Sequence, residues 1–233
     1  MADVSRETSA PDPVVLAEIF PPDRLVLLEA YADLLATEGV TRGLIGPREV
    51  PRLWDRHLVN CGLLAPLVPV DATVADLGSG AGLPGLVLAI ARPDLRVTLV
   101  EPMARRVAFL DEARTRLGLD GVEVVRERAE QWTEQRRFNV VTARALAALP
   151  KLLGWAMPLV AGGGQLLAMK GSSAAGEIAA SEAELRRWRA SAEVVTSSVP
   201  GSSTTTVVRV VRGASAGIGW GPSRTGRRPG GHA

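Results

Sequence analysis

The sequence has a single cysteine, Cys61, among its 233 residues, so it can form neither an internal disulfide nor a site that needs several cysteines. Lysine is scarce as well and occurs only at positions 151 and 170. No apolar run is long enough for a membrane span, and the first 13 residues lack the apolar segment of a secretory signal. We therefore expect a protein of the reducing cytoplasm that does not enter a membrane.

Acidic residues are missing from the C-terminal end. All 25 of them lie at or before Glu193, whereas five arginines follow, at positions 209, 212, 224, 227 and 228. The larger part of the chain is therefore slightly acidic, and its net charge does not by itself indicate a nucleic-acid surface. Residues 213–233 are rich in glycine and lack periodicity, so we expect a disordered basic tail that is either solvated or in contact with phosphate.

Helical spacing dominates the first part of the chain. Leu25, Leu28 and Ala32 follow one another at three- and four-residue intervals, which is the spacing of one buried helix face. No strand-like run interrupts this part. We expect a flexible N-terminus over residues 1–12 and a small helical cap over residues 13–70.

Short apolar runs then alternate with helical candidates. The runs typical of strands are residues 73–77, 96–100, 122–125, 138–142 and 165–169. The helical candidates are residues 84–91, 103–118, 127–135, 148–161 and 176–190, to within a few positions. Such alternation predicts a parallel sheet covered by helices on both faces.

Two further strand-like runs, at residues 193–199 and 204–211, are separated by four residues. So short a gap cannot hold a parallel crossover, and these runs must pair as an antiparallel hairpin. Five parallel strands followed by a hairpin resemble the seven-stranded, mostly parallel sheet of class I methyltransferases, a Rossmann-like α/β fold. We expect residues 71–212 to form such a domain.

A glycine-rich segment, Asp76–Gly85 (DLGSGAGLPG), follows the first predicted strand. Glycine allows positive φ and a close approach of backbone to ligand, and open α/β sheets bind ligands at this position. The spacing G-x-G-x-x-G also occurs in dinucleotide-binding proteins. Asp76 distinguishes the two cofactors, because a carboxylate would repel a pyrophosphate but suits the sulfonium and ammonium of S-adenosylmethionine. We therefore expect S-adenosylmethionine as the cofactor.

Acids near the ends of the next two strands support this choice. Glu101 ends the second predicted strand, about 20 residues after the loop, where an acid accepts ribose hydroxyls. Ala129 and Glu130 follow the third, where a backbone N–H and an acid could border the adenine. Without the glycine-rich segment, Glu101 would be an ordinary acid at a strand end, and residues 129–130 would be part of an ordinary polar loop.

The segment after the fourth predicted strand, residues 141–145 (VTARA), faces the transferred methyl group in this architecture. It lacks the Asn/Asp-Pro-Pro-aromatic motif of exocyclic-amine methyltransferases. Pyrimidine carbon methylation needs a cysteine nucleophile, yet Cys61 lies in the cap. His57 and His232 have no acidic or cysteine partners at metal-ligand spacing, so we expect no metal.

A nucleophile that needs no deprotonation, such as guanine N7, fits what remains. Catalysis would then depend on alignment and on electrostatic placement of the base. Arg144 could donate to guanine or phosphate or pack against the cofactor. The alternative to these roles is that Arg144 forms a surface salt bridge.

With these residues assembled, the sequence resembles the RsmG (GidB) family of 16S ribosomal RNA guanine-N7 methyltransferases over roughly residues 24–211. The motifs that carry the resemblance are GSGAGLPG at 78–85, RP at 92–93, EP at 101–102, RRVAFL at 105–110, TARALA at 142–147, AMKG at 168–171 and RHL at 56–58. Two stretches depart from the family pattern: Asn60-Cys61 replaces an Asp-Ser pair, and Gly43-Leu44-Ile45 replaces an Asn-Leu-Thr stretch.

The resemblance implies a cytoplasmic enzyme whose partner is 16S rRNA, as the small ribosomal subunit or an assembly intermediate. We expect a monomer. Arg144 and Lys170, the predicted catalytic residues, would face the RNA. With the inferences above, the predicted cofactor-binding residues are Asp76, Gly78, Ser79, Gly80, Gly82, Leu83, Glu101, Ala129, Glu130 and Arg144.

Three other functions stay open at this point. They are methylation of a small molecule by the same fold, an inactive module that binds cofactor or RNA, and a nicotinamide-dependent oxidoreductase. The last would need a further substrate domain. Transfer of labelled methyl into rRNA rather than into a metabolite extract would distinguish rRNA methylation from methylation of a small molecule. Calorimetry with S-adenosylmethionine and with a dinucleotide would test the oxidoreductase alternative.

Overall fold

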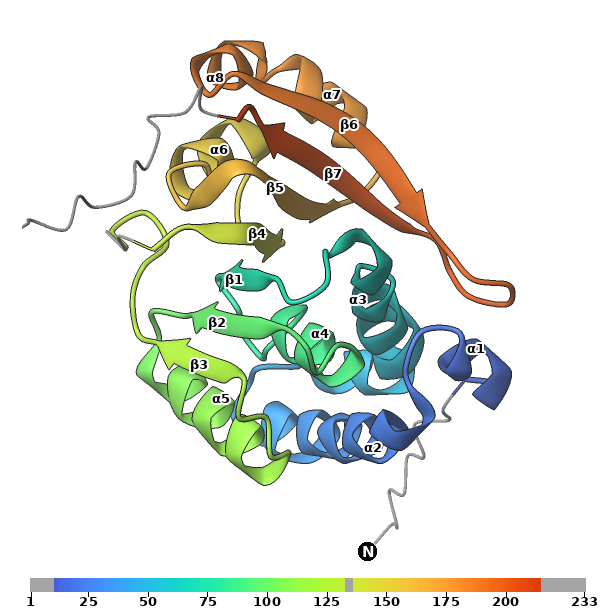
Figure 1. The fold of residues 1–233 in the computed structure, drawn as a ribbon. Coiled ribbons are helices and arrows are strands. Elements are labelled where there is room, and N and C mark those ends of the chain that lie inside the picture. The colour runs from blue at the N-terminus through green and yellow to red at the C-terminus, as the bar shows by residue number, and fades with distance from the viewer. Residues whose placement is uncertain (1–10, 133–135, 215–233) are drawn as a thin grey trace, which may run out of the picture.

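The structure, a computed structural model, describes residues 11–132 and 136–214 (Figure 1). The predicted flexible N-terminus and basic tail lie largely outside these residues. The cap is helical, as its spacing predicted. Its elements are α1 (Pro13–Ala17), η1 (Pro22–Arg24), α2 (Leu25–Leu34), η2 (Leu35–Gly39), η3 (Pro47–Arg52), η4 (Leu53–Val59), α3 (Asn60–Gly62) and η5 (Ala65–Leu67).

A seven-stranded sheet forms the centre of the molecule (Figure 1). Its strands are β1 (Thr73–Leu77), β2 (Arg96–Val100), β3 (Val122–Val125), β4 (Phe138–Arg144), β5 (Val160–Lys170), β6 (Ala190–Ser197) and β7 (Thr205–Arg212). Their order is β3-β2-β1-β4-β5-β7-β6. β1 to β5 pair in parallel, whereas β7 runs antiparallel to both β5 and β6. The predicted sheet and terminal hairpin are therefore confirmed.

Three predicted helices differ from the observed ones. The helices beyond the cap are α4 (Gly85–Ala91), α5 (Ala104–Arg116), α6 (Leu149–Ala156), α7 (Ala174–Ala179) and α8 (Glu182–Arg187). The predicted helix at 127–135 is wrong over its described residues, which form a turn with Ala129 as their only buried side chain. One buried residue cannot define an apolar helix face.

The other two differences concern boundaries. The helix predicted at 148–161 ends at Ala156 because Val160 already pairs in β5, and Pro158 lacks the N–H that would continue the helix. The helix predicted at 176–190 is two helices, α7 and α8. They separate at the buried Ser181, whose hydroxyl donates to the Glu177 carbonyl.

Two apolar clusters lie on the two faces of the sheet. Val74 and Val140 belong to the cluster that also contains cap residues and residues of α4 and α5. Ala75 and Val141, their neighbours in the same strands, belong to the cluster that contains residues of α6. This is the period-two alternation of strands. The cap thus shares its core with one face of the sheet.

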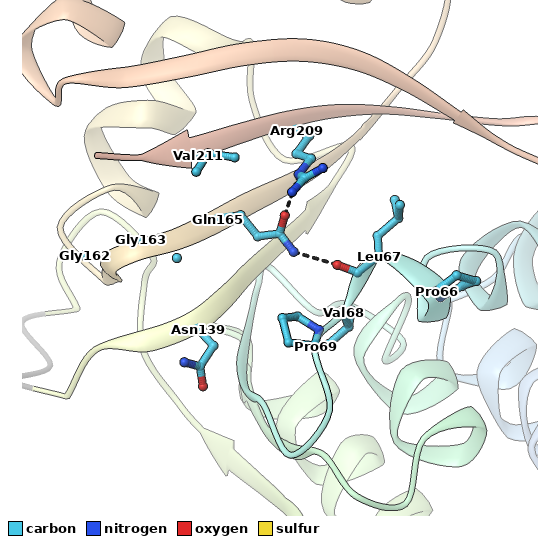
Figure 2. Close-up of a pocket in the computed structure, with 11 residues that line it drawn as sticks. Pro66, Leu67, Val68, Pro69, Asn139, Gly162, Gly163, Gln165, Arg209 and Val211 are labelled. Atoms are coloured by element: carbon cyan, nitrogen blue, oxygen red, sulfur yellow. Dashed lines mark hydrogen bonds between the residues drawn. The ribbon is translucent and has the colours of Figure 1, made fainter. Parts of the chain in front are cut away.

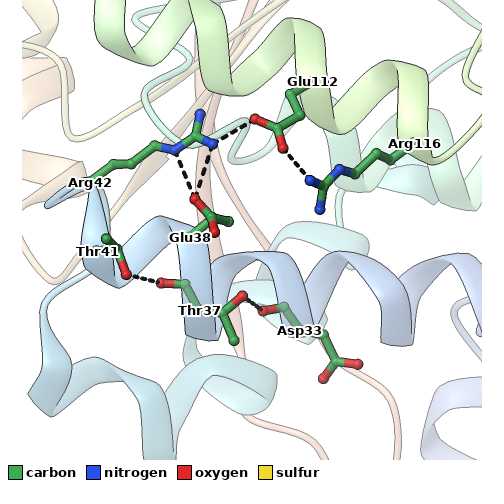
Figure 3. Close-up of polar contacts among 7 residues, drawn as sticks. All are labelled: Asp33, Thr37, Glu38, Thr41, Arg42, Glu112 and Arg116. Atoms are coloured by element: carbon green, nitrogen blue, oxygen red, sulfur yellow. Dashed lines mark hydrogen bonds and ion pairs between the residues drawn. The ribbon is translucent and has the colours of Figure 1, made fainter.

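An ion-pair network joins the cap to α5 (Figure 3). The Arg42 guanidinium donates to the Glu38 carboxylate at 3.0 and 3.1 Å and to Glu112 Oε2 at 2.6 Å. It also lies 5.8 Å from the centre of the Phe109 ring. Glu112 contacts Arg116 as well. Because the Arg42 and Glu112 side chains are each 28% exposed, solvent screens much of this attraction.

Replacing Arg42 with alanine is expected to lower the free energy of unfolding by only about 1 kcal/mol. Urea unfolding followed by circular dichroism measures this change. Arg116→Ala is the control, since it leaves both Arg42 contacts in place, and its effect should be smaller. A loss near 4 kcal/mol for Arg42→Ala would instead indicate that the network behaves as a buried one.

Candidate active site

A cavity of about 360 Å³ lies at the carboxyl ends of β1, β2 and β4. Its walls come from the glycine loop, from the residues that follow β2, from the residues that follow β4, and from two cap segments. This volume is in the range of small-molecule sites. The position is the one where open α/β sheets bind ligands.

A second cavity, of about 390 Å³, lies near the amino ends of β1 and β4 (Figure 2). Two of its polar side chains already have hydrogen-bond partners within the protein. Gln165 Nε2 donates to the backbone carbonyl of Leu67 at 2.6 Å, and Arg209 Nε donates to Gln165 Oε1 at 2.8 Å. None of the predicted site residues lines it. The cavity at the carboxyl ends is therefore the candidate active site.

The glycine loop has the conformation that its composition predicted. Gly78, Gly80 and Gly82 all have positive φ, at 68°, 60° and 96°, which L side chains rarely adopt. At Gly85, the first residue of α4, the constraint is space. A Cβ there would lie 2.3 Å from Leu99 Cδ2 and 2.8 Å from Asp76 Oδ2.

Gly85→Ala is therefore expected to lower the free energy of unfolding by about 3 kcal/mol, because the added methyl group overpacks a buried contact. Thermal unfolding measures the change. Gly176→Ala is the matched control: a Cβ on this glycine of α7 meets nothing within 4 Å, so alanine should slightly stabilise the helix. Equal stability of the two variants would contradict the close approach at Gly85.

Asp76 lies beneath the loop rather than in the cavity wall. Its side chain is fully buried. Oδ2 accepts the Gly85 N–H at 3.1 Å, and Oδ1 accepts the Thr142 hydroxyl at 3.0 Å. Burial raises the pKa of Asp76 to about 6, against the lowering effect of these hydrogen bonds. Both of its oxygens therefore hold the loop and β4 together, and its contact with the cofactor stays a prediction.

Glu101, which follows β2, does line the cavity. Its Oε2 accepts the Gly80 N–H and its Oε1 accepts the Met103 N–H, both at 3.0 Å. Arg106 Nη1 lies 3.6 Å from Oε2. Each carboxylate oxygen can accept more than one hydrogen bond, so Glu101 can hold the loop and still accept ribose hydroxyls.

The structure separates the other predicted residues into two groups. Those that line the cavity are Gly78, Ser79, Gly80, Leu83, Glu101 and Arg144. Gly82 is in the same loop but packs toward Leu86 and the Tyr31 hydroxyl. Ala129 is buried in the second apolar cluster, and the Glu130 carboxylate lies 3.8 Å from Arg128.

Lys170, predicted to face the RNA, is also outside the cavity wall. Its Nζ donates to the Ala147 carbonyl and to Glu177 Oε2, both at 2.7 Å. Glu177 Oε2 also accepts the Leu149 N–H. The ammonium is only partly exposed and pairs inside the protein, so Lys170 braces the segment after β4, and its contact with RNA stays a prediction.

Arg144, which ends β4, has partners that sequence reasoning missed. Its Nη2 is hydrogen-bonded to His57 Nδ1, and its Nη1 lies 3.4 Å from Cys61 Sγ. His57 Nε2 in turn lies 3.0 Å from Glu49 Oε2. The surface salt bridge considered for Arg144 is therefore not what the described residues form.

The two stretches that depart from the family pattern both lie at this end of the site. Leu44 and Ile45 line the cavity, and Cys61 contacts Arg144. A second cap contact joins the Tyr31 hydroxyl to the Ala81 carbonyl at 2.6 Å. The cap therefore completes the site, a role that its helical spacing alone did not reveal.

The described residues, 11–132 and 136–214, lack two further features. None of the helices there is both long enough and apolar enough to cross a bilayer. Those same residues contain no group of three or more His, Cys, Asp or Glu side chains arranged to hold a metal ion.

Solved structures with the same fold are methyltransferases. The N-methyltransferase NodS from Bradyrhizobium japonicum, in complex with S-adenosyl-L-homocysteine, superposes with a TM-score of 0.53 at 16% identity, covering 76% of this chain and 98% of that one. A methyltransferase from Pyrococcus furiosus gives 0.52 at 13% identity, covering 65% and 80%. At such low identity the likeness shows the fold alone, which is the predicted class I methyltransferase fold.

Sequence comparison is more specific. The model of the GidB family, described as rRNA small subunit methyltransferase G, matches residues 24–205. A ribosomal RNA small subunit methyltransferase G from Nocardioides sp. is 60% identical, covering 98% of this chain and 92% of that protein. A protein of the same name from Thermobifida fusca is 52% identical, covering 90% of both. The resemblance inferred from the motifs is confirmed, and the chain belongs to the GidB family of rRNA small subunit methyltransferases G.

Proposed function

We propose that this protein transfers a methyl group from S-adenosylmethionine to N7 of one guanine in the 16S rRNA of the small ribosomal subunit. The observation that carries the proposal is a single cavity shared by the glycine loop, by Glu101 and by Arg144. Membership of the GidB family supports rRNA as the substrate. The chain is thus a cofactor-dependent RNA methyltransferase rather than an oxidoreductase or an inactive binding module.

The residues present fit the cofactor. S-adenosylmethionine supplies, when bound, a methyl group on a cationic sulfur. Gly78 and Gly80 contribute backbone without a side chain of their own to the cavity wall, and Glu101 offers its carboxylate to the ribose hydroxyls. The buried Asp76 carboxylate beneath the loop adds negative charge close to that cation.

The cavity also favours a nucleophile that needs no base. Of the residues that line it, only Glu101 and His57 carry a carboxylate or an imidazole that could act as a base. Glu101 accepts two backbone N–H groups, and His57 contacts Arg144 through one ring nitrogen and Glu49 through the other. Guanine N7 presents a free in-plane lone pair, so alignment and electrostatic placement suffice for its methylation.

RNA would approach from the cap side of the cavity. Arg48, Arg52 and Arg56 are exposed on the segment that leads to His57 in the cavity wall. Exposed arginines next to a site are suited to phosphate contacts. We expect the enzyme to act in the cytoplasm as a monomer. Its substrate would be the small subunit or an assembly intermediate, and recognition of such a ribonucleoprotein does not require a strongly basic enzyme.

The test is methyl transfer from labelled S-adenosylmethionine to 16S rRNA from cells that lack this protein. Naked rRNA, assembly intermediates and complete small subunits are compared, with a metabolite extract as the alternative acceptor. The proposal expects N7-methylguanosine at one position, located by nuclease mapping and mass spectrometry. Label in the metabolite fraction, or on another atom of the RNA, would contradict it.

A further inference from the structure

His57 lies between a carboxylate and a guanidinium at the rim of the active-site cavity. It belongs to η4, and its side chain is only 10% exposed. Glu49, from η3, meets its Nε2 at 3.0 Å, and Arg144, from the end of β4, meets its Nδ1. Arg56 lies 3.5 Å from the other oxygen of Glu49, and the Cys61 thiol contacts Arg144. These are the charged and titratable groups that face His57.

The contacts define the protonation state of the imidazole ring. A guanidinium can only donate hydrogen bonds, so His57 Nδ1 must carry the lone pair that accepts from Arg144. The ring hydrogen then lies on Nε2, where it donates to Glu49. Only the neutral ring with this tautomer satisfies both partners, because a protonated ring would direct an N–H toward the N–H groups of Arg144.

We infer that His57, oriented by Glu49, is a positioning residue that holds the Arg144 guanidinium in the active-site cavity. This inference rests on the proposed function and deepens it by explaining how the cap acts on the reaction. Among the described residues, no carboxylate forms a hydrogen bond or an ion pair with Arg144. A neutral acceptor therefore fixes its direction while leaving its charge free for the guanine or a phosphate.

This arrangement predicts a pH dependence. The pKa of His57 is lowered by burial, and further by the positive charge of Arg144, while Glu49 opposes the shift. The ring is therefore mostly neutral at pH 7 and gains its proton at a lower pH than an ordinary histidine does. Protonation removes the acceptor for Arg144, so kcat should fall as the pH decreases through the pKa of His57.

Two substitutions separate the two contacts of the ring. In His57→Asn the side-chain oxygen is near the place of Nδ1 and can still accept from Arg144. In His57→Gln the longer amide is near the place of Nε2 and can still contact Glu49, but the acceptor for Arg144 is lost. We expect kcat to fall about tenfold in His57→Gln and to recover most of that loss in His57→Asn, while the Kd for S-adenosylmethionine and the Tm change little.

A double-mutant cycle tests whether the effect passes through Arg144. Adding His57→Gln to Arg144→Ala should cause no further loss of kcat, because the group to be positioned is absent. The acid limb of the pH profile should disappear in the same background. Losses that multiply, or an acid limb that persists, would overturn the inference.

A measurement without rRNA keeps the inference separate from the proposed function. The chain has only two histidines, so His57 can be followed by NMR with His232→Asn as the assignment control. Arg144→Gln should raise the pKa of His57, and Glu49→Gln should lower it. Absence of both shifts would refute the contacts, whereas clear shifts in an enzyme that does not methylate rRNA would refute only the proposed substrate.

Discussion

Arg144→Ala is expected to lower kcat for rRNA methylation by about two orders of magnitude. Arg144, at the end of β4, is one of the two arginines in the cavity wall, with Arg106, and its loss removes both alignment and electrostatic placement of the guanine. Single-turnover methyl transfer at saturating cofactor measures the effect on the chemical step. Calorimetry with S-adenosylmethionine, run in parallel, shows how much of the effect is on cofactor affinity.

The matched control is Arg209→Ala. Arg209 is a partly exposed arginine of β7 that contacts Gln165 and Glu193 beside the second cavity. Its removal should leave the single-turnover rate near that of the wild type. Equal losses in the two variants would show that general destabilisation is responsible, and full activity in Arg144→Ala would remove this residue from the mechanism.

Glu101→Ala is expected to raise the Kd for S-adenosylmethionine about a hundredfold. The substitution removes the acceptor for ribose and orphans the N–H groups of Gly80 and Met103, which Glu101 now satisfies. Hydrogen bonds to a charged group contribute roughly 1.5–3 kcal/mol each, and a loss of about 3 kcal/mol corresponds to two orders of magnitude in Kd. Titration calorimetry at fixed salt measures the change.

Glu182→Ala controls for the loss of a carboxylate. Glu182 is an exposed residue of α8 that pairs with Arg186, and its removal should leave cofactor affinity intact. The Kd of Glu101→Gln for S-adenosylmethionine should lie between those of Glu182→Ala and Glu101→Ala. The amide keeps one oxygen as an acceptor, but its NH2 group faces a backbone N–H that needs an acceptor. A wild-type Kd in Glu101→Ala would show that the carboxylate serves only the loop.

Local patterns in the sequence determined most of the fold. Short apolar runs located the strands, because the alternation of side chains across a strand depends only on neighbouring residues. The four-residue gap between the last two predicted strands required a hairpin on geometric grounds. The glycine loop and Glu101 were found in the same way, since loop conformation and strand ends are local features. The helix predicted at 127–135 is wrong over residues 127–132, where Ala129 is the only buried residue and no buried face exists.

Only the tertiary structure decided how the site is held. Arg144 and His57 are 87 residues apart, Thr142 and Asp76 are 66 apart, and Tyr31 reaches Ala81 across 50. No periodicity connects such positions, because they meet only after the cap packs on the sheet. The sequence therefore identified the cofactor loop and the family motifs, while packing decided that Asp76 and Lys170 brace the site and that the cap positions Arg144.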